Sequence, residues 1–126
     1  MDKDVENLAK VLAVLVADGN YTYVDKIGNA PSKDLLAFYM KEAMRDFHSI
    51  IRGGTKNEKA EGFLKDLKSK IESGNVNLDA SVKTFLDRIP EGDRQKLREL
   101  SSILAARALA ISAKYIKSSK EIEGGE

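Results

Sequence analysis

The sequence predicts an all-α fold, a compact bundle of about five helices, and three observations support this prediction. Apolar residues recur every three or four positions along most of the chain, which is the spacing of one helix face. Helix-stop signals separate these periodic segments at Gly19, Gly53-Gly54, Gly74 and Pro90. With 126 residues, of which 42% are apolar and 33% charged, the chain is long enough to bury one core without cross-links.

A first helix is predicted from about Asp4 to Ala17, because apolar residues line one of its faces. The next stretch, NYTYVDKIGNAP, fits either a short helical turn or an extended piece, and residues 20–24 are one place for a minor β element. Pro31 disfavours helical backbone at Ala30, so this stretch is expected to end there. The apolar face of the first helix consists of Val5, Leu8, Leu12, Leu15 and Val16.

A second helix is predicted from about Lys33 to Arg52, ended by the two glycines that follow. Ser32 is a suitable N-cap, and Asp34 in the first turn is favoured by the helix dipole. The core-facing side of this helix is expected to carry Leu36, Met40, Ala43, Met44, Phe47, Ile50 and Ile51.

Two shorter helices follow. Thr55 and Glu58 match a capping box that opens a third helix, which is expected to end near Gly74. Asp79 is the expected cap of a fourth helix before the turn at Pro90, and residues 75–78 are the second place for a minor β element. The apolar positions are Ala60, Phe63, Leu64, Leu67 and Ile71 in the third helix, and Val82, Phe85, Leu86 and Ile89 in the fourth.

The last helix is long and rich in alanine, and it is predicted from about Asp93 to Ser119 as the central helix of the bundle. Ile103, Leu109 and Ile116 fall outside its main apolar seam and need a different partner, either another helix of the domain or another subunit. The main seam consists of Leu97, Leu100, Leu104, Ile111 and Tyr115.

The organisation that follows is one helical domain over residues 1–119 and a disordered acidic tail over residues 120–126. The tail holds Glu121, Glu123 and Glu126 against a single lysine. The first ten residues are acidic and amphipathic, unlike a signal peptide, and no apolar run is long enough to span a bilayer.

Composition excludes several classes of site. The chain has no cysteine, which excludes disulfides, thiolate zinc sites and cysteine nucleophiles and is typical of a reducing compartment. Its net charge is +1, whereas a free-standing DNA-binding domain is usually more basic, so strong autonomous affinity for nucleic acid is not expected.

A basic stripe is predicted on the second helix. Lys41, Arg45, His48 and Arg52 fall within about 60° of one another on a helical wheel, opposite the core face. Phe38 lies on the same side, where an aromatic ring between cations is able to stack on a base or anchor a protein contact. The alternative interpretation is a solvated charged face, since Glu42 and Asp46 flank the stripe at pairing distance.

A second basic line is predicted on the last helix, where Lys96, Arg107 and Lys114 fall within about 20° of one another. The alternative interpretation of Arg107 is an arginine whose stem lies along the core while its head reaches water.

Signs of catalysis are weak. The run from Gly53 to Lys56 holds the letters of a phosphate loop without its spacing or its preceding strand. His48, the only histidine, has no convergent partner in the local sequence. The chain is therefore predicted to have no catalytic residue, no metal site and no cofactor.

The residues NYTYVDKIGNAPS, the following helix with RDFHSIIRGG, the small size and the Ala-rich last helix together resemble a known family. The family is the small subunit of archaeal type I-A CRISPR interference complexes, the archaeal Cascade. The small subunits of type III complexes, which are also compact helical proteins, are a close competitor.

The resemblance implies a non-catalytic, cytoplasmic subunit of a ribonucleoprotein built on a guide RNA. Its partners would be the backbone subunits of Cascade and, weakly, guide RNA or target DNA; self-association is a further option, and no membrane is involved. Phosphate contact is assigned to Lys41, Arg45, Arg52, Arg107 and Lys114, and Phe38 is the stacking or subunit-contact residue. The alternative function is a helical protein–protein interaction module, such as an adaptor or viral regulator.

Overall fold

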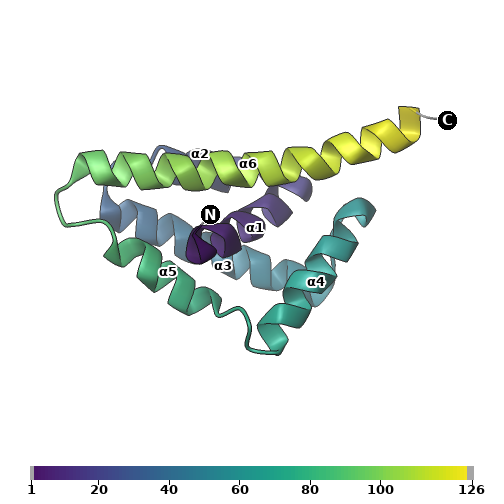
Figure 1. Cartoon of the computed structure of the whole chain (residues 1–126), viewed down its shortest axis with the longest axis horizontal. Coiled ribbons are helices and arrows are strands. Elements are labelled where there is room, and N and C mark those ends of the chain that lie inside the picture. Colours follow the sequence, from purple (N-terminus) through teal and green to yellow (C-terminus); the bar gives the residue numbers. More distant parts are fainter. Residues whose placement is uncertain (1, 125–126) are drawn as a thin grey trace.

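The computed structural model describes residues 2–124, together with the side chains of residues 2–58 and 60–114. Its elements are α1 (Lys3–Ala17), α2 (Thr22–Gly28), α3 (Lys33–Gly53), the 3-10 turn η1 (Glu58–Ala60), α4 (Glu61–Glu72), α5 (Leu78–Asp87) and α6 (Arg94–Gly124). The fold is all-α, as predicted. In Figure 1, α6 runs along the top of the view, α3 lies behind α1, and α4 and α5 form the lower side.

The six α-helices differ from the predicted five by α2, because the stretch after Asn20 takes the helical alternative. Neither position considered for a minor β element is a strand in residues 2–124. At the second of them, the N–H of Val76 donates to the carbonyl oxygen of Lys70, and Leu78 already belongs to α5. The last helix continues through Gly124, past its predicted end near Ser119, whereas residues 125 and 126 of the predicted tail lie outside the described residues.

The centre of the bundle is α1, so the prediction that the last helix is central is wrong. Ten of the 15 residues of α1 are buried, and α6, α5, α3 and α2 all contact it. The physical reason is its composition: from Val11 to Val16 the helix carries only Ala, Val and Leu, so every side of it avoids water. The structure gives α6 contacts with α1, α2 and η1, which leave one of its sides open.

The first turns of the helices show which of the predicted N-caps are correct. Ser32 caps α3 as predicted, because its hydroxyl accepts from the N–H of Leu35 at 3.2 Å. The cap of α5 is Asn77, whose side chain accepts from Ala80, two residues before the predicted Asp79. The hydroxyl of Thr55 accepts from the N–H of Asn57 at 3.1 Å and donates to Asp18. Contact with α1 therefore replaces the predicted capping geometry.

The predicted core faces are largely confirmed. On α3, Leu36, Met40, Ala43, Met44 and Phe47 are buried, while Ile50 and Ile51 are half-buried. In α6, Leu97, Leu100, Leu104 and Ile111 are buried, and the side chain of Tyr115 lies outside the described ones. At one point α2 packs tightly against α6, because a Cβ added to Gly28 would lie 2.9 Å from the Cβ of Ala105.

Candidate functional site

The outer face of α3 carries the predicted basic stripe. Lys41, Arg45, His48 and Arg52 are all exposed, and Phe38 beside them is 53% exposed. The core face of the same helix fixes this orientation, because Leu36, Met40 and Phe47 on its opposite side are fully buried. The structure therefore brings the five residues of the α3 stripe, Phe38, Lys41, Arg45, His48 and Arg52, onto one accessible surface.

The charges on the α3 stripe are only partly compensated. Arg45 lies 3.6 Å from Glu42 and 3.9 Å from Asp46, and its side chain is 71% exposed, so these ion pairs are loose. Lys41 and Arg52 form no ion pair among the described residues. Asp46 is also engaged on its other side, because the Tyr23 hydroxyl donates to it. Burial, followed by this hydrogen bond, raises the pKa of Tyr23 to about 12.

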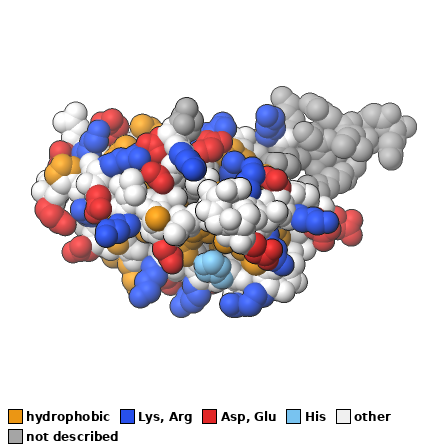
Figure 2. Space-filling model, turned by 60° about the horizontal axis from the view of Figure 1, so that its bottom comes forward, with side chains coloured by type: hydrophobic (Ala, Val, Ile, Leu, Met, Phe, Trp, Pro, Cys, Tyr) orange, Lys and Arg blue, Asp and Glu red, His pale blue; other side chains and the backbone are white. Residues whose placement is uncertain are grey.

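A shallow hollow lies at the C-terminal end of the α3 stripe. It has a volume of about 290 Å³ and lies between His48 of α3 and the α4–α5 connection, with Ile71, Val76 and Leu78 in its wall. In Figure 2 the single histidine is exposed at the lower side of the molecule, and Lys and Arg side chains gather along that edge. Proteins bind single-stranded nucleic acids with aromatic and apolar side chains, on which bases stack, and with nearby cations, which contact the phosphates.

Arg107 does not extend a second basic line. Its Nε and Nη2 atoms donate to the two carboxylate oxygens of Glu6, each at 2.8 Å, and this bidentate pair joins α6 to α1. The hydrogen bonds from Arg107 hold the pKa of Glu6 below its ordinary value. Lys96 lies 3.7 Å from Glu99, while Lys114 is exposed and has an interaction of its own. The intramolecular pair is the physical reason to remove Arg107 from the candidate phosphate contacts.

A second candidate surface lies between α2 and α6, and the sequence predicted only part of it. Ile103 and Leu109 lie outside the seam of α6, as predicted, and are 42% and 45% exposed. Tyr21, which is 58% exposed at the start of α2, lines a hollow of about 430 Å³ with Leu109. No local pattern marks Tyr21 as part of this surface, because only the packing of α2 on α6 brings it there.

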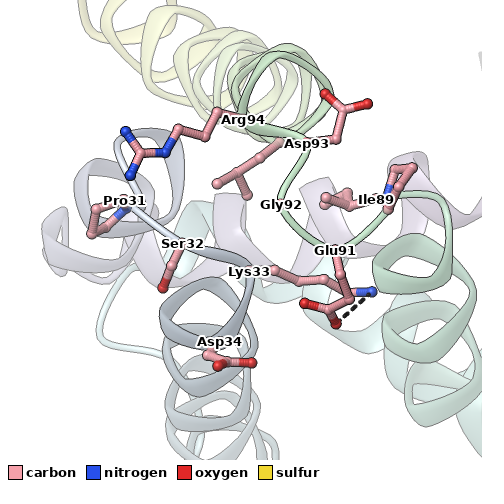
Figure 3. Close-up of a pocket in the computed structure, with 11 residues that line it drawn as sticks. Pro31, Ser32, Lys33, Asp34, Ile89, Glu91, Gly92, Asp93 and Arg94 are labelled. Carbon is pink, nitrogen blue, oxygen red and sulfur yellow. Dashed lines mark ion pairs between the residues drawn. The ribbon is translucent and has the colours of Figure 1, made fainter.

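A third hollow, of about 230 Å³, lies where the starts of α3 and α6 meet. Figure 3 shows Lys33 of α3 reaching towards Glu91, and their charged atoms are 3.6 Å apart. Arg94, Asp34 and Asp93 also line this hollow, so its lining combines two basic and three acidic side chains. Among the described residues, no group of three or more His, Asp or Glu side chains is arranged to hold a metal ion.

Within the described part of the chain, no helix combines the length and the apolar content that crossing a membrane requires. No family model matches the sequence, and no solved structure matches it. The chain is 51% identical over 111 residues to an uncharacterized protein of Archaeoglobus fulgidus, an alignment that covers 86% of this chain and 88% of that protein.

Proposed function

We propose that this chain, which belongs to one protein family with the Archaeoglobus fulgidus relative, is a non-catalytic small subunit of an RNA-guided CRISPR interference ribonucleoprotein. In that role it contacts neighbouring subunits and binds the nucleic-acid backbone weakly, without reading the sequence. The observation that carries the binding role is the α3 stripe, where three permanent cations and an exposed aromatic ring share one face. The choice of assembly rests on the sequence resemblance to archaeal type I-A small subunits.

The size of the α3 stripe supports a weak, auxiliary contact. From Lys41 to Arg52 the helix rises about 16 Å, which is enough to follow several phosphates of one strand. Three cations on single-stranded nucleic acid predict a slope of log Kobs against log salt of about −2. Such a surface binds little on its own, but it adds useful affinity when several copies line one bound strand, because effective concentration combines weak contacts.

The division of work in a guided complex fits this surface. Base pairing with the guide supplies sequence specificity, so a protein subunit need only hold phosphates and stack bases. Lys41, Arg45 and Arg52 are proposed to contact phosphates, Phe38 to stack on a base or contact a subunit, and His48 to line the adjacent hollow. Lys114 is retained only as a secondary contact.

A helical protein–protein interaction module is the second candidate function, and one observation favours it. Tyr21, Ile103 and Leu109 together expose large apolar side chains that a solitary soluble helix bundle has no need to leave uncovered. In that case, loss of partner capture follows substitution of these residues, and salt has little effect on capture.

The first experiment is a salt series of fluorescence-anisotropy binding to single-stranded DNA, starting at low salt. We compare the wild type with Arg45→Glu/Arg52→Glu and with the matched control Lys3→Glu/Lys83→Glu, which makes the same change of net charge on exposed sites of α1 and α5. The proposal expects binding that weakens as salt rises, with a slope of about −2, and that the stripe variant loses and the control largely keeps. Equal loss in both variants would mean that only net charge matters.

The decisive experiment uses the assembled ribonucleoprotein. We expect Arg45→Glu/Arg52→Glu to leave the far-UV CD spectrum and the melting temperature of the subunit nearly unchanged while it weakens retention of target DNA. Full retention by a complex that contains the variant would remove the α3 stripe from the nucleic-acid path and leave the protein-interaction module as the better proposal.

A further inference from the structure

The hollow at the C-terminal end of the α3 stripe offers surfaces on which a flat ring can lie. Its wall includes Val76 and Leu78, which are buried, and Ile71, which is half-buried. The exposed imidazole of His48 lines the same hollow. Nucleobases stack on aromatic rings of this kind. With a volume of about 290 Å³, the hollow is at the lower end of the sizes of small-molecule sites, which suits a single base.

Cations of the α3 stripe lie on both sides of His48 along the helix. Arg45 precedes it by three positions and Arg52 follows it by four, so each arginine is within about 6 Å of His48 along the helix axis. Both arginines are exposed, and Figure 2 shows Lys and Arg side chains along the edge that carries the histidine. A strand whose phosphates contact these cations therefore has a base within reach of the hollow.

The start of α5 adds polar groups to the hollow. The side chain of Asp79 lines it, is exposed, and forms no ion pair among the described residues. Asn77 also lines it, and its side-chain oxygen accepts from the N–H of Ala80 at 3.1 Å. The Nδ2 group of the same amide is then the one left to donate. The hollow therefore combines a carboxylate, which accepts two hydrogen bonds side by side, with a separate donor.

This set of polar groups matches guanine better than the other bases. The Watson–Crick edge of guanine carries two adjacent donors, N1–H and the N2 amino group, beside one acceptor, O6. A carboxylate accepts from both donors at once, and an amide N–H donates to O6. Adenine and cytosine place a ring-nitrogen acceptor next to their amino donor, which a carboxylate does not match, and thymine and uracil have a single donor on this edge.

We propose that the hollow between α3 and the α4–α5 connection is a binding pocket for one unpaired guanine base. His48 stacks on the ring, Asp79 accepts from N1–H and the N2 amino group, and Asn77 donates to O6. The pocket deepens the proposed function and rests on it for the strand that delivers the base, because the α3 stripe holds the phosphates. Contact with one base adds a preference at one nucleotide and leaves recognition of the sequence to the guide.

Fluorescence anisotropy at low salt with short labelled strands tests the base preference. We compare thymidine strands that carry one central guanine, inosine or adenine, since inosine lacks the N2 amino group. The wild type is expected to bind the guanine strand about fivefold more tightly than the adenine strand, with the inosine strand between them. The same series in uridine RNA tells whether DNA, RNA or both supply the base. Equal affinity for all three strands in both series would overturn the proposal.

Variants at the pocket test the assigned roles. Asp79→Asn should remove the preference for guanine while binding to an all-thymidine strand is kept, because the α3 stripe is intact. Asp87→Asn, the same change of charge at another exposed site of α5, should keep the preference. His48→Ala should weaken binding of the guanine and adenine strands alike, because it removes the stacking surface. A guanine preference that survives Asp79→Asn, with far-UV CD spectra unchanged, would overturn the pocket.

A titration with guanosine monophosphate separates the pocket from the α3 stripe. In NMR spectra of the backbone N–H groups, the signals of Gly74, Val76 and Leu78 should shift on addition of this nucleotide, both in the wild type and in Arg45→Glu/Arg52→Glu. Adenosine monophosphate, which carries the same phosphate, should shift them less at equal concentration. Strand binding without these shifts would overturn the pocket and leave the proposed function standing. Shifts without strand binding would support the pocket and count against the α3 stripe, so the two failures are distinguishable.

Discussion

The middle segments of α1 and α6 are similarly apolar, but the one in α1 is fully buried and the one in α6 is partly exposed. The run from Val11 to Val16 is buried on every side, because α6, α5, α3 and α2 surround it. The run from Ile103 to Ala113 is buried on one side only, and Leu109 at its centre is 45% exposed. An apolar helix segment therefore shows which surface is favourable to bury, but not whether other helices of the same chain bury it.

The difference between the two helices lies in how much of each surface the other helices cover. Four later helices, α2, α3, α5 and α6, pack against α1, and polar contacts anchor its two ends. There Arg88 of α5 pairs with Asp2 and Asp4, and Asp18 accepts from the backbone N–H of Lys56 at 2.7 Å. The helices α1 and α2 pack on α6 and leave the side that carries Ile103 and Leu109 exposed.

The largest expected effect is at the centre of α1. Leu12 is 2% exposed, so Leu12→Ala removes buried methylene groups and leaves a cavity that the surrounding helices cannot fill. We expect the free energy of unfolding to fall by about 3 kcal/mol. Urea denaturation followed by CD measures it. A loss well below 1 kcal/mol would contradict the central position of α1.

A smaller effect is expected where α2 meets α6. A Cβ at Gly28 would lie 2.9 Å from the Cβ of Ala105, and neither group is the end of a flexible side chain, so α2 must shift away from α6. Gly28→Ala should lower the free energy of unfolding by about 1 kcal/mol, because the destabilisation from overpacking exceeds the gain in helix propensity.

The double variant Gly28→Ala/Ala105→Gly isolates this contact. Removing the methyl group of Ala105 relieves the overlap, so the stability loss of the two changes together should be smaller than the sum of their separate losses. Strict additivity in thermal unfolding would show that α2 does not press on α6 at this point.

Sequence reasoning recovered the features that depend on neighbouring positions along one helix. The buried side of α3, with Leu36, Met40 and Phe47, and its exposed stripe both follow from the helical period. The same period placed Ile103 and Leu109 outside the seam of α6, without deciding whether another helix would cover them.

The missed features depend on residues far apart in the chain. Glu6 and Arg107 are 101 positions apart, and no local pattern pairs them, so neither interpretation of Arg107, as part of a basic line or as an arginine whose head reaches water, predicted this ion pair. Thr55 matched a capping box, but a partner 37 positions earlier, Asp18, competes for its hydroxyl. Tyr21 joined the surface between α2 and α6 only through packing. Pairings of this kind are decided by the tertiary arrangement of the helices.

The ion pair between Glu6 and Arg107 joins α1 to α6 and makes the stability of the fold depend on pH. The pKa of Glu6 is held below its ordinary value of about 4.5 in the folded chain, so its stabilising contribution is complete above that pH. It is lost as the pH falls through the folded pKa. Glu6→Gln should lower the free energy of unfolding by about 1 kcal/mol near neutral pH. This figure allows for screening by solvent, because the Arg107 side chain is 38% exposed.

Thermal unfolding of wild type and Glu6→Gln from pH 7 to pH 3 checks both the size and the sign. The two stabilities should converge as the pH falls below about 4.5, because the wild type then loses the same ion pair. Glu72→Gln, at an exposed position of α4, is the control and should show no such convergence. A constant difference at all pH values would mean that Glu6 acts through packing rather than through its charge.

The smallest effect on the monomer is expected at the centre of α6. Leu109→Ala removes as much side chain as Leu12→Ala, but the leucine is 45% exposed and leaves no closed cavity, so monomer stability should change by less than about 0.5 kcal/mol. Thermal unfolding should therefore give wild type and Leu109→Ala nearly the same melting temperature. A large loss would instead place Leu109 in the core of its own chain, and the contrast between α1 and α6 would then disappear.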